Sequence, residues 1–194
     1  MGDTRLDNTS ASWPDPISLA EVQRVAAPHP SILAIDRFIS QCRITSHRRG
    51  GPGGQHRNKV SSAIIALHLT TGVSAEANER RDQSQNRQVA IDRLRIRLAI
   101  VLRTAGGPDA GIEAEEIRAR WRCGSLKISE SNTDRSAVLA LLLDDLHRAG
   151  GQPSLVANLW QLSTSAVVQF VASQPAAFQL VNQWRSYHGR SALH

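Results

Sequence analysis

Residues 48–59 constrain this chain more than any other stretch, because they place four glycines and one proline within a run of cations. Glycine adopts positive φ angles without steric cost and lets backbone N–H groups approach a ligand closely. Pro52 fixes one φ angle and stiffens the middle of the stretch. The tip would be the triplet Gly53-Gly54-Gln55, with cations suited to holding phosphates on either side. These cations are Arg48, Arg49, Arg57 and Lys59.

Two familiar phosphate-binding loops do not fit these residues. A dinucleotide fingerprint that starts at Gly51 would need a glycine where His56 stands. A P-loop would need a glycine directly before Lys59, where the chain has Asn58. The stretch therefore matches neither kind of nucleotide site.

The positive charge of the chain is concentrated around this stretch. The 194 residues carry a formal net charge of +6. Residues 41–103 hold 12 cations against 4 acids, whereas residues 1–40 have a net charge of −2 and residues 104–194 a net charge of 0. If these arginines were only solvated side chains on an exposed helix, the excess positive charge would not need to be confined to residues 41–103. We therefore expect residues 41–103 to belong to a nucleic-acid-binding domain.

The glycine-rich stretch, together with residues spread over a whole domain, resembles the catalytic domain of class I peptide chain release factors, which is known by its Gly-Gly-Gln motif. The triplet alone is a weak signal, but the extended string is specific. The resemblance runs from about residue 43 to about residue 102. The matching residues are Gly51-Pro52-Gly53-Gly54-Gln55-His56, Asn58-Lys59, Ser62-Ala63, His68, Thr71-Gly72-Val73, Glu76, Arg81, Gln83, Gln85-Asn86-Arg87 and Ala90.

The resemblance implies hydrolysis of the ester between a finished peptide and its tRNA, in the peptidyl transferase centre of the large ribosomal subunit. In the family, the backbone N–H of the motif glutamine stabilises the oxyanion, and its side chain admits water while excluding larger nucleophiles. Both roles would fall to Gln55, while Gly53 and Gly54 would permit the backbone conformation. No metal or cofactor is implied. Contacts with ribosomal RNA and peptidyl-tRNA would come from Arg48, Arg49, His56, Arg57, Asn58, Lys59, Arg81 and Arg87.

Five positions depart from the family pattern and indicate a divergent branch. Arg49 and Gly50 replace the usual small hydroxyl residues. Arg57 stands at a position that is usually apolar, Ser61 at one that is usually acidic, and Thr70 where a proline is common. None of these changes touches the catalytic triplet, so they bear on docking more than on the reaction.

The pattern of residues 1–104 predicts an α+β fold, in which antiparallel strands pack on a long helix. Residues 1–30 are predicted to be a flexible N-terminal segment, with a short helix across residues 17–25. A helix starting at Pro30 and strands at residues 39–46, 62–68 and 73–77 would follow, with Gly72 in the turn of a hairpin. Asp82 and Gln85 form a capping box for a helix over residues 83–103. Its buried stripe would be Ala90, Leu94, Leu98 and Val101.

The arginines that lie mostly off this stripe are expected to face ribosomal RNA or solvent. They are Arg87, Arg93, Arg95 and Arg97.

Residues 109–194 are predicted to form a separate, all-α domain, after the catalytic domain at residues 31–104. Apolar spacing predicts helices over residues 111–122, 136–149, 153–161, 163–173 and 175–189, with Phe178, Val181, Trp184 and Tyr187 inward on the last. The helices at 153–161 and 163–173 could form a helix-turn-helix, with Thr164, Ser165 and Gln169 exposed. An ordinary helical bundle is the favoured reading, since this segment has no net positive charge.

Single residues elsewhere carry less information. His68 matches a family histidine, but a packed structural role is favoured. His47 and His56 do not have metal-ligand spacing with each other or with Cys42. Two widely spaced cysteines, no signal peptide and no apolar run of membrane-spanning length predict a cytoplasmic protein with free thiols.

The segment that would direct the protein to its target is not recognisable. Release factors carry a separate domain that reads the stop codon, and about 40 residues before the catalytic domain leave no room for one. The C-terminal residues 187–194 do not resemble the Lys/Arg-rich tail of shorter rescue relatives. The favoured hypothesis is a codon-independent peptidyl-tRNA hydrolase that rescues stalled ribosomes. An RNA- or ribosome-binding adaptor without hydrolytic activity is the alternative, and a DNA-binding regulator using the C-terminal helices is more distant.

Overall fold

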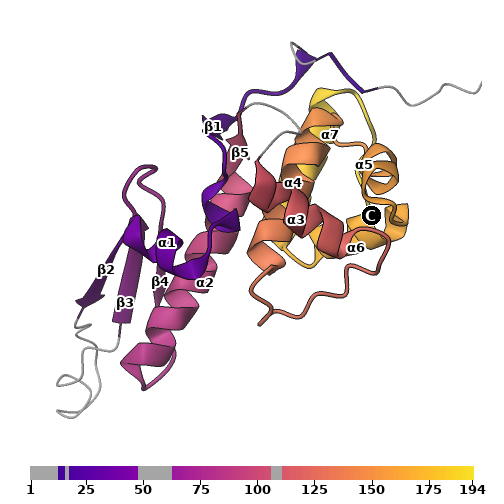
Figure 1. The fold of residues 1–194 in the computed structure, drawn as a ribbon. Coiled ribbons are helices and arrows are strands. Elements are labelled where there is room, and N and C mark those ends of the chain that lie inside the picture. The colour runs from indigo at the N-terminus through magenta and orange to yellow at the C-terminus, as the bar shows by residue number, and fades with distance from the viewer. Residues whose placement is uncertain (1–12, 16–17, 48–62, 106–110) are drawn as a thin grey trace, which may run out of the picture.

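The computed structural model describes residues 13–15, 18–47, 63–105 and 111–194, which form an α+β protein with two lobes (Figure 1). The N-terminal lobe is an antiparallel sheet in the order β2-β3-β4, with the long helix α2 packed against it. The C-terminal lobe contains helices α3 to α7. The predicted α+β fold is confirmed.

The sheet follows the alternation of its central strand. The strands are β2 (Cys42–His47), β3 (Ala63–His68) and β4 (Ser74–Ala77), and α1 (Ile35–Ser40) precedes them. Ile64, Ala66 and His68 alternate along β3 and are buried on one face of the sheet. Gly72 takes a φ of +70° in the turn between β3 and β4, which favours glycine.

Helix α2 (Gln83–Val101) is buried on two sides, because it lies between the sheet and the C-terminal lobe. Ala90, Leu94 and Leu98 belong to the apolar core beneath the sheet, as expected, whereas Ala99 belongs to the core of the C-terminal lobe. The expected burial of Val101 is wrong, since 40% of its surface is exposed.

Two short strands were not predicted. The chain leaves α2 at Val101 instead of residue 103, and β5 (Leu102–Thr104) pairs in parallel with β1 (Gln23–Val25). The helix expected across residues 17–25 is therefore wrong: residues 19–22 are not helical and residues 23–25 form β1. The helix expected from Pro30 is interrupted: a 3₁₀ turn, η2 (Pro30–Ile32), comes first and α1 starts only at Ile35.

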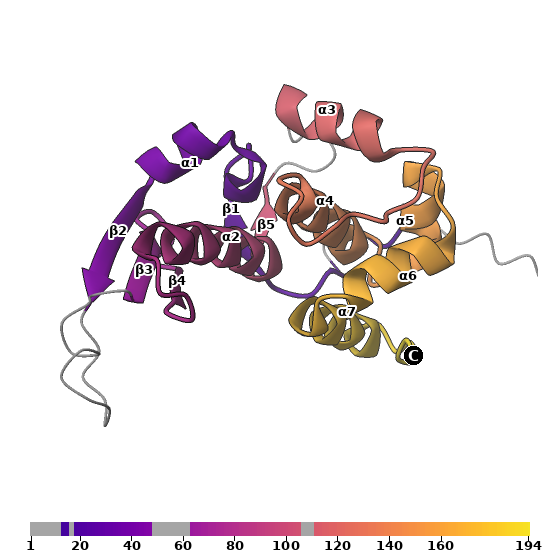
Figure 2. The same ribbon diagram turned by 90° about the horizontal axis from the view of Figure 1, so that it is seen from below.

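The five helices of the C-terminal lobe lie where apolar spacing predicts them. They are α3 (Ile112–Trp121), α4 (Arg135–Arg148), α5 (Pro153–Trp160), α6 (Thr164–Ala172) and α7 (Pro175–Tyr187). Helix α4 runs through the middle of the lobe, with α3 and α7 on opposite sides (Figure 2), and every residue from Arg135 to His147 is buried. The expected inward position of Tyr187 is wrong, because 63% of its surface is exposed.

Helices α5 and α6 meet at an angle of 110°, and Ser163 caps α6 by accepting a hydrogen bond from the N–H of Ala166. This angle lies in the range of helix-turn-helix motifs. Val167, Phe170 and Val171 of α6 are nevertheless buried in the core of the lobe.

In the described part of the chain, no single helix is long and apolar enough to cross a membrane; α5 and α6 reach that length and composition only as a bent pair.

Polar contacts join the two lobes. The N–H of Thr104 donates to Asp144 Oδ1 over 3.1 Å, and Arg103 Nη1 lies 3.5 Å from the same oxygen. The guanidinium of Arg103 is buried, stacks 5.4 Å from the ring of Trp184 and donates to the carbonyl oxygens of Ala99 and Ile100. Because burial disfavours the charged form, the pKa of Arg103 falls to about 10.

Acid should destabilise the fold through His29. This histidine is fully buried, its Nδ1 accepts a hydrogen bond from the N–H of Ser31, and burial together with the charge of Arg103 lowers its pKa from 6.5 to about 3. A folded pKa below the unfolded one means that the unfolded chain binds the extra proton. Stability is then lost as pH falls from 6.5 toward 3, by about 1.4 kcal/mol per pH unit.

Urea denaturation between pH 4 and 7 measures this loss. The His29→Gln variant should show a shallower fall in the free energy of unfolding with pH, by about one proton. Burial also lowers the pKa of His68 and His147, so part of the slope should persist in the variant. Equal slopes for the two proteins would show that His29 is not the group responsible.

Candidate functional site

The segment with the predicted catalytic triplet begins and ends at one end of the sheet. His47 at the end of β2 pairs with Ala63 at the start of β3, so residues 48–62 connect two neighbouring antiparallel strands (Figure 1). The segment itself lies outside the described residues. It contains Gly53, Gly54 and Gln55, and the predicted RNA contacts Arg48, Arg49, His56, Arg57, Asn58 and Lys59.

A hollow of about 420 Å³ lies next to the strand ends. Its walls come from β2, β3 and the first turns of α2, where Arg87 contributes its side chain. Arg87 is exposed, and its guanidinium has no hydrogen-bond partner among the described residues. Arg81, in the connection before α2, is exposed as well. The two predicted RNA contacts that the structure describes are thus accessible near the ends of residues 48–62.

The start of α2 is fixed by its cap. Asp82 Oδ1 accepts hydrogen bonds from the N–H groups of Ser84, over 2.6 Å, and Gln85, over 3.3 Å. These hydrogen bonds, first of all those from Ser84, hold the pKa of Asp82 below its usual range. The predicted capping role of Asp82 is confirmed, and it sets where Arg87 emerges one turn later.

Asn86 is a positioning residue whose role was not predicted. Its side chain is fully buried, and it pairs with both backbone groups of Arg80: the N–H of Arg80 donates to Oδ1 over 2.9 Å, and Nδ2 donates to the carbonyl oxygen over 2.8 Å. This double hydrogen bond ties the connection that carries Arg81 to helix α2. The sequence signal was its place in the matching string Gln85-Asn86-Arg87.

Three of the four arginines expected to face RNA or solvent make hydrogen bonds within the N-terminal lobe, but only one of them, Arg95, is buried. Arg95 is buried and donates to the carbonyl oxygens of Ser31 and Leu33 over 2.8 and 3.1 Å, so the expectation is wrong for this residue. Arg93 binds Glu79 and the carbonyl oxygen of Glu76. Arg97 donates to the carbonyl oxygen of Ser74 over 3.0 Å. Arg87, Arg93 and Arg97 are exposed, as expected.

His68 has the structural role that was predicted. Its ring lies in the core, 6.1 Å from the stacked ring of Phe38, with hydrogen bonds to Thr71 Oγ1 and Gln41 Oε1. Burial lowers its pKa, so the neutral ring is favoured. Within the described ranges, no three His, Cys, Asp or Glu side chains come together as a metal site would require. Cys42 and Cys123 are free thiols.

Comparison with known proteins agrees with this architecture. A family model described as the RF-1 domain matches residues 34–139, which is more than half of the chain. The chain belongs to the RF-1 domain family.

Curated relatives are peptide chain release factors. Peptide chain release factor 2 of Paramagnetospirillum magneticum is 48% identical over 59 residues, which cover 30% of this chain and 16% of the relative. Peptide chain release factor 2 of Sulfurimonas denitrificans is 34% identical over 127 residues, covering 61% of this chain and 34% of the relative. A mitochondrial peptide chain release factor 1-like protein of Rattus norvegicus is 38% identical over 71 residues, covering 37% and 19%. The chain therefore matches about a third or less of the length of these relatives.

Replacing Asn86 with aspartate should lower the free energy of unfolding by about 1–3 kcal/mol, because the carbonyl oxygen of Arg80 loses its donor while a charge is buried. Chemical denaturation at pH 7 measures the loss. Gln169→Glu makes the same amide-to-carboxylate change on the exposed side of α6 and should stay within about 0.5 kcal/mol of wild type. An equally small effect at Asn86 would mean that the Arg80 contact does not stabilise the fold.

Proposed function

We propose that this protein hydrolyses peptidyl-tRNA on the ribosome, with residues 48–62 entering the peptidyl transferase centre of the large subunit. The observation that carries the proposal is the pairing of His47 with Ala63, which holds both ends of the Gly-Gly-Gln segment at one end of the sheet. Membership of the RF-1 domain family supports it. Exposed Arg81 and Arg87 near this end would bind phosphates of ribosomal RNA or tRNA.

In the proposed reaction, a water molecule attacks the ester carbonyl that joins the peptide to tRNA. The backbone N–H of Gln55 would donate a hydrogen bond to the oxyanion, and its side chain would admit water and exclude larger nucleophiles. Gly53 and Gly54 would let the backbone take the necessary conformation. The cations that flank the triplet, together with His56 and Asn58, would contact the RNA walls of the centre.

We further propose that release is independent of the codon, as in the rescue of stalled ribosomes in the cytoplasm. The matched regions account for 34% or less of the release factors named above. Residues 111–194 form a helical lobe, and residues 104–194 hold as many acids as cations. In this proposal, residues 31–104 are the catalytic domain and residues 109–194 a targeting domain.

Peptide release from ribosomes with a labelled peptidyl-tRNA in the P site tests both proposals. Complexes whose A site is empty, holds a sense codon or holds a stop codon would be compared. Similar release rates in all three, each lowered about 10²–10³-fold by Gln55→Pro, are the expected result. Dependence on a stop codon would refute codon independence. Ribosome binding without release in any complex would favour the adaptor.

A further inference from the structure

The sheet β2-β3-β4 has two edge strands, and side chains of α2 cover one of them. In an antiparallel sheet every second residue exchanges hydrogen bonds with the neighbouring strand, and the residues between them turn their backbone groups away from it. On β4 the residues turned outward are Ser74 and Glu76. Arg97 and Arg93 donate to their carbonyl oxygens over 3.0 and 2.9 Å. The β4 edge is therefore closed by two arginines.

The edge formed by β2 is open. The carbonyl oxygen of Gln41 accepts a hydrogen bond from the N–H of Leu69 over 3.0 Å, which fixes the residues of β2 that pair with β3. The residues that turn their N–H and C=O groups away from β3 are then Cys42, Ile44 and Ser46. Within the described part of the chain, nothing forms a hydrogen bond with these outward groups. An edge of this kind can accept a further strand.

The hollow of about 420 Å³ lies beside this open edge. Ile44 and Ser46 line it from β2, and Gln83, Ser84 and Arg87 line it from the first turns of α2. Because side chains alternate between the two faces of a strand, a strand added to β2 would direct every second side chain toward this hollow. Hydrogen bonds along the edge would supply affinity, and the hollow would select the side chain that enters it.

The charges on both faces of β2 favour an acidic strand. Residues 37–75 hold six cations and no acid. Arg87 is exposed in the hollow, and its guanidinium has no hydrogen-bond partner among the described residues. Arg43 is exposed on the opposite face of β2, because it alternates with the residues that line the hollow. Carboxylates at neighbouring positions of an added strand would therefore meet a cation on either face.

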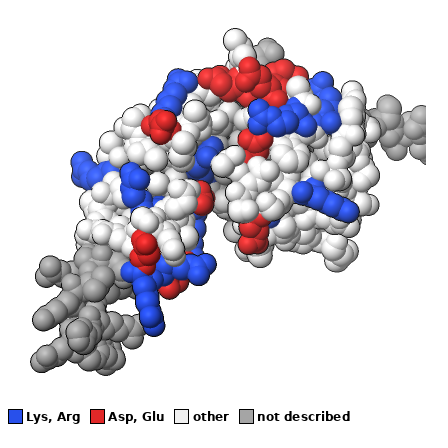
Figure 3. All heavy atoms as spheres, turned by 60° about the horizontal axis from the view of Figure 1, so that its bottom comes forward, with Lys and Arg blue, Asp and Glu red and all other residues white. Residues whose placement is uncertain are grey.

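Nearby acids do not cancel these charges. Figure 3 shows basic and acidic side chains next to one another on the N-terminal lobe. Of these acids, Glu79 is paired with Arg93, and Asp82 accepts hydrogen bonds from N–H groups at the start of α2. Glu76 shares the face of Arg43, but it lies on β4, two strands or about 10 Å from β2. The described residues that line the hollow include no acid.

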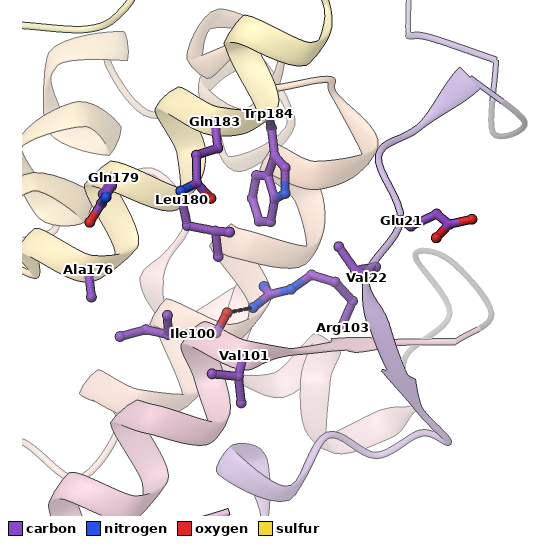
Figure 4. A pocket seen from close by; sticks show the side chains of 10 residues that line it. All are labelled: Glu21, Val22, Ile100, Val101, Arg103, Ala176, Gln179, Leu180, Gln183 and Trp184. Carbon is purple, nitrogen blue, oxygen red and sulfur yellow. Dashed lines mark hydrogen bonds between the residues drawn. The ribbon is translucent and has the colours of Figure 1, made fainter.

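The hollow at the junction of the lobes offers less to an acidic ligand. Figure 4 shows Arg103 in the wall of this hollow of about 380 Å³, with its guanidinium turned to the carbonyl oxygen of Ile100. Arg103 is only 2% exposed and lies 3.5 Å from Asp144, so its charge is already used within the fold. At Arg87, in contrast, a carboxylate would reach an exposed guanidinium.

A second copy of this chain and an RNA strand fit the β2 edge less well than an acidic peptide. Two β2 edges that paired with each other would bring the cations of both copies together, and like charges on neighbouring strands repel. RNA phosphates would match the charge, but a sugar–phosphate backbone does not repeat the alternating N–H donors and C=O acceptors of a strand. An extended acidic peptide meets both requirements.

We propose that the β2 edge binds an extended acidic segment of a partner protein, which adds a fourth strand to the sheet and places a carboxylate at Arg87. About five residues suffice to reach the outward groups from Cys42 to Ser46. Because Arg87 is also proposed to bind RNA, the partner and the ribosome would exclude each other. This consequence rests on the proposed function, whereas the binding of the strand does not.

A synthetic peptide tests the proposal on the full-length protein. The probe has about nine residues, with valine and threonine throughout and two adjacent glutamates at its centre, so that one carboxylate points to each face. At saturation it should slow hydrogen exchange of the outward amides of Ile44 and Ser46 by about tenfold or more. The amides of Arg43 and Thr45, which already face β3, should change little.

Ser46→Pro removes one outward N–H and should weaken binding of the probe by about tenfold, since an edge strand tolerates proline where its N–H faces solvent. The matched change Ser74→Pro removes an outward N–H from the β4 edge and should leave binding unchanged. Folding of both variants is checked by urea denaturation. A probe that carries N-methyl groups on alternate amides tests the same hydrogen bonds with the wild-type protein, and it should not bind.

The charge of the probe supplies the second test. Replacing its glutamates with glutamine should weaken binding to wild type by about tenfold, and Arg87→Gln should remove most of this preference. Equal binding of the N-methylated probe, or unchanged exchange at Ile44 and Ser46, would overturn the proposal. So would slowed exchange of the same amides by an RNA oligonucleotide, or by self-association of the protein without any probe.

Peptide release on ribosomes separates the contact from its consequence. The acidic probe should slow release by the wild-type protein, and the glutamine probe should have a smaller effect. Full release at a saturating concentration of the bound probe would refute the mutual exclusion of partner and ribosome. Absence of release without any probe would instead refute the proposed hydrolase, so the two failures are distinguishable.

Discussion

Replacing Arg103 with methionine should lower the free energy of unfolding by about 3–5 kcal/mol, because the change leaves the Asp144 carboxylate buried without its cation. Asp144 is largely shielded from water, and burial already raises its pKa. The same change removes the hydrogen bonds to the carbonyl oxygens of Ala99 and Ile100 at the end of α2. Urea denaturation at pH 7, followed by circular dichroism, measures the loss.

Two further variants separate the ion pair from general damage. In Arg103→Met/Asp144→Leu both charges are gone, so much of the lost stability should return. Arg37→Met breaks the exposed pair of Arg37 with Glu113, for which both side chains are about half exposed, and should cost about 1 kcal/mol or less. If Arg103→Met costs no more than Arg37→Met, the buried pair does not secure the junction of the lobes.

The junction of the two lobes explains why the sequence predicts two separate domains, whereas in the structure one helix packs against both lobes. The sequence predicts one domain at residues 31–104 and another at residues 109–194, with a boundary after the long helix. In the structure, α2 shares its buried surface between the sheet and α4, so Ala99 belongs to the second core. Apolar residues at a period of 3.6 predict one buried face of a helix. A helix that packs on two sides, such as α2, buries residues outside that face as well.

Local patterns predicted the elements whose signals are local. The alternation along β3, the Gly72 turn, the Asp82 cap and the apolar spacing of α4 to α7 all lie within single stretches of sequence. Strands β1 and β5 were missed because each has three residues and they pair across nearly 80 positions, from Gln23 to Leu102. The residues of neither strand predict which segment it pairs with.

In the candidate site, too, features with a local sequence signal were predicted and features that depend on distant residues were not. Arg87 and Arg81 could be chosen from the matching string, and both are exposed. Arg95 could not be told from them, because the carbonyl oxygens that bury its guanidinium belong to Ser31 and Leu33, more than sixty residues away.

Replacing Gln55 with proline should reduce the rate of peptide release on ribosomes by about 10²–10³, because proline lacks the N–H that is proposed to bind the oxyanion. Gln55→Ala keeps this N–H and should lose less hydrolytic activity. It should instead lose discrimination among nucleophiles, so that added hydroxylamine captures more of the released peptide than it does with wild type. Single-turnover release with and without hydroxylamine measures both effects.

The two substitutions separate the backbone from the side chain at one position. Ribosome binding, measured by co-sedimentation, should be unchanged in both, since the cations that flank the triplet remain. A large loss in Gln55→Ala with no change in nucleophile selectivity would assign catalysis to the side chain and contradict the proposed roles. Full activity of Gln55→Pro would remove the oxyanion donor from residue 55 altogether. The expected pattern would instead assign the chemistry to the backbone. It would explain how a chain of this family could hydrolyse an ester although the triplet Gly53-Gly54-Gln55 has no nucleophilic side chain.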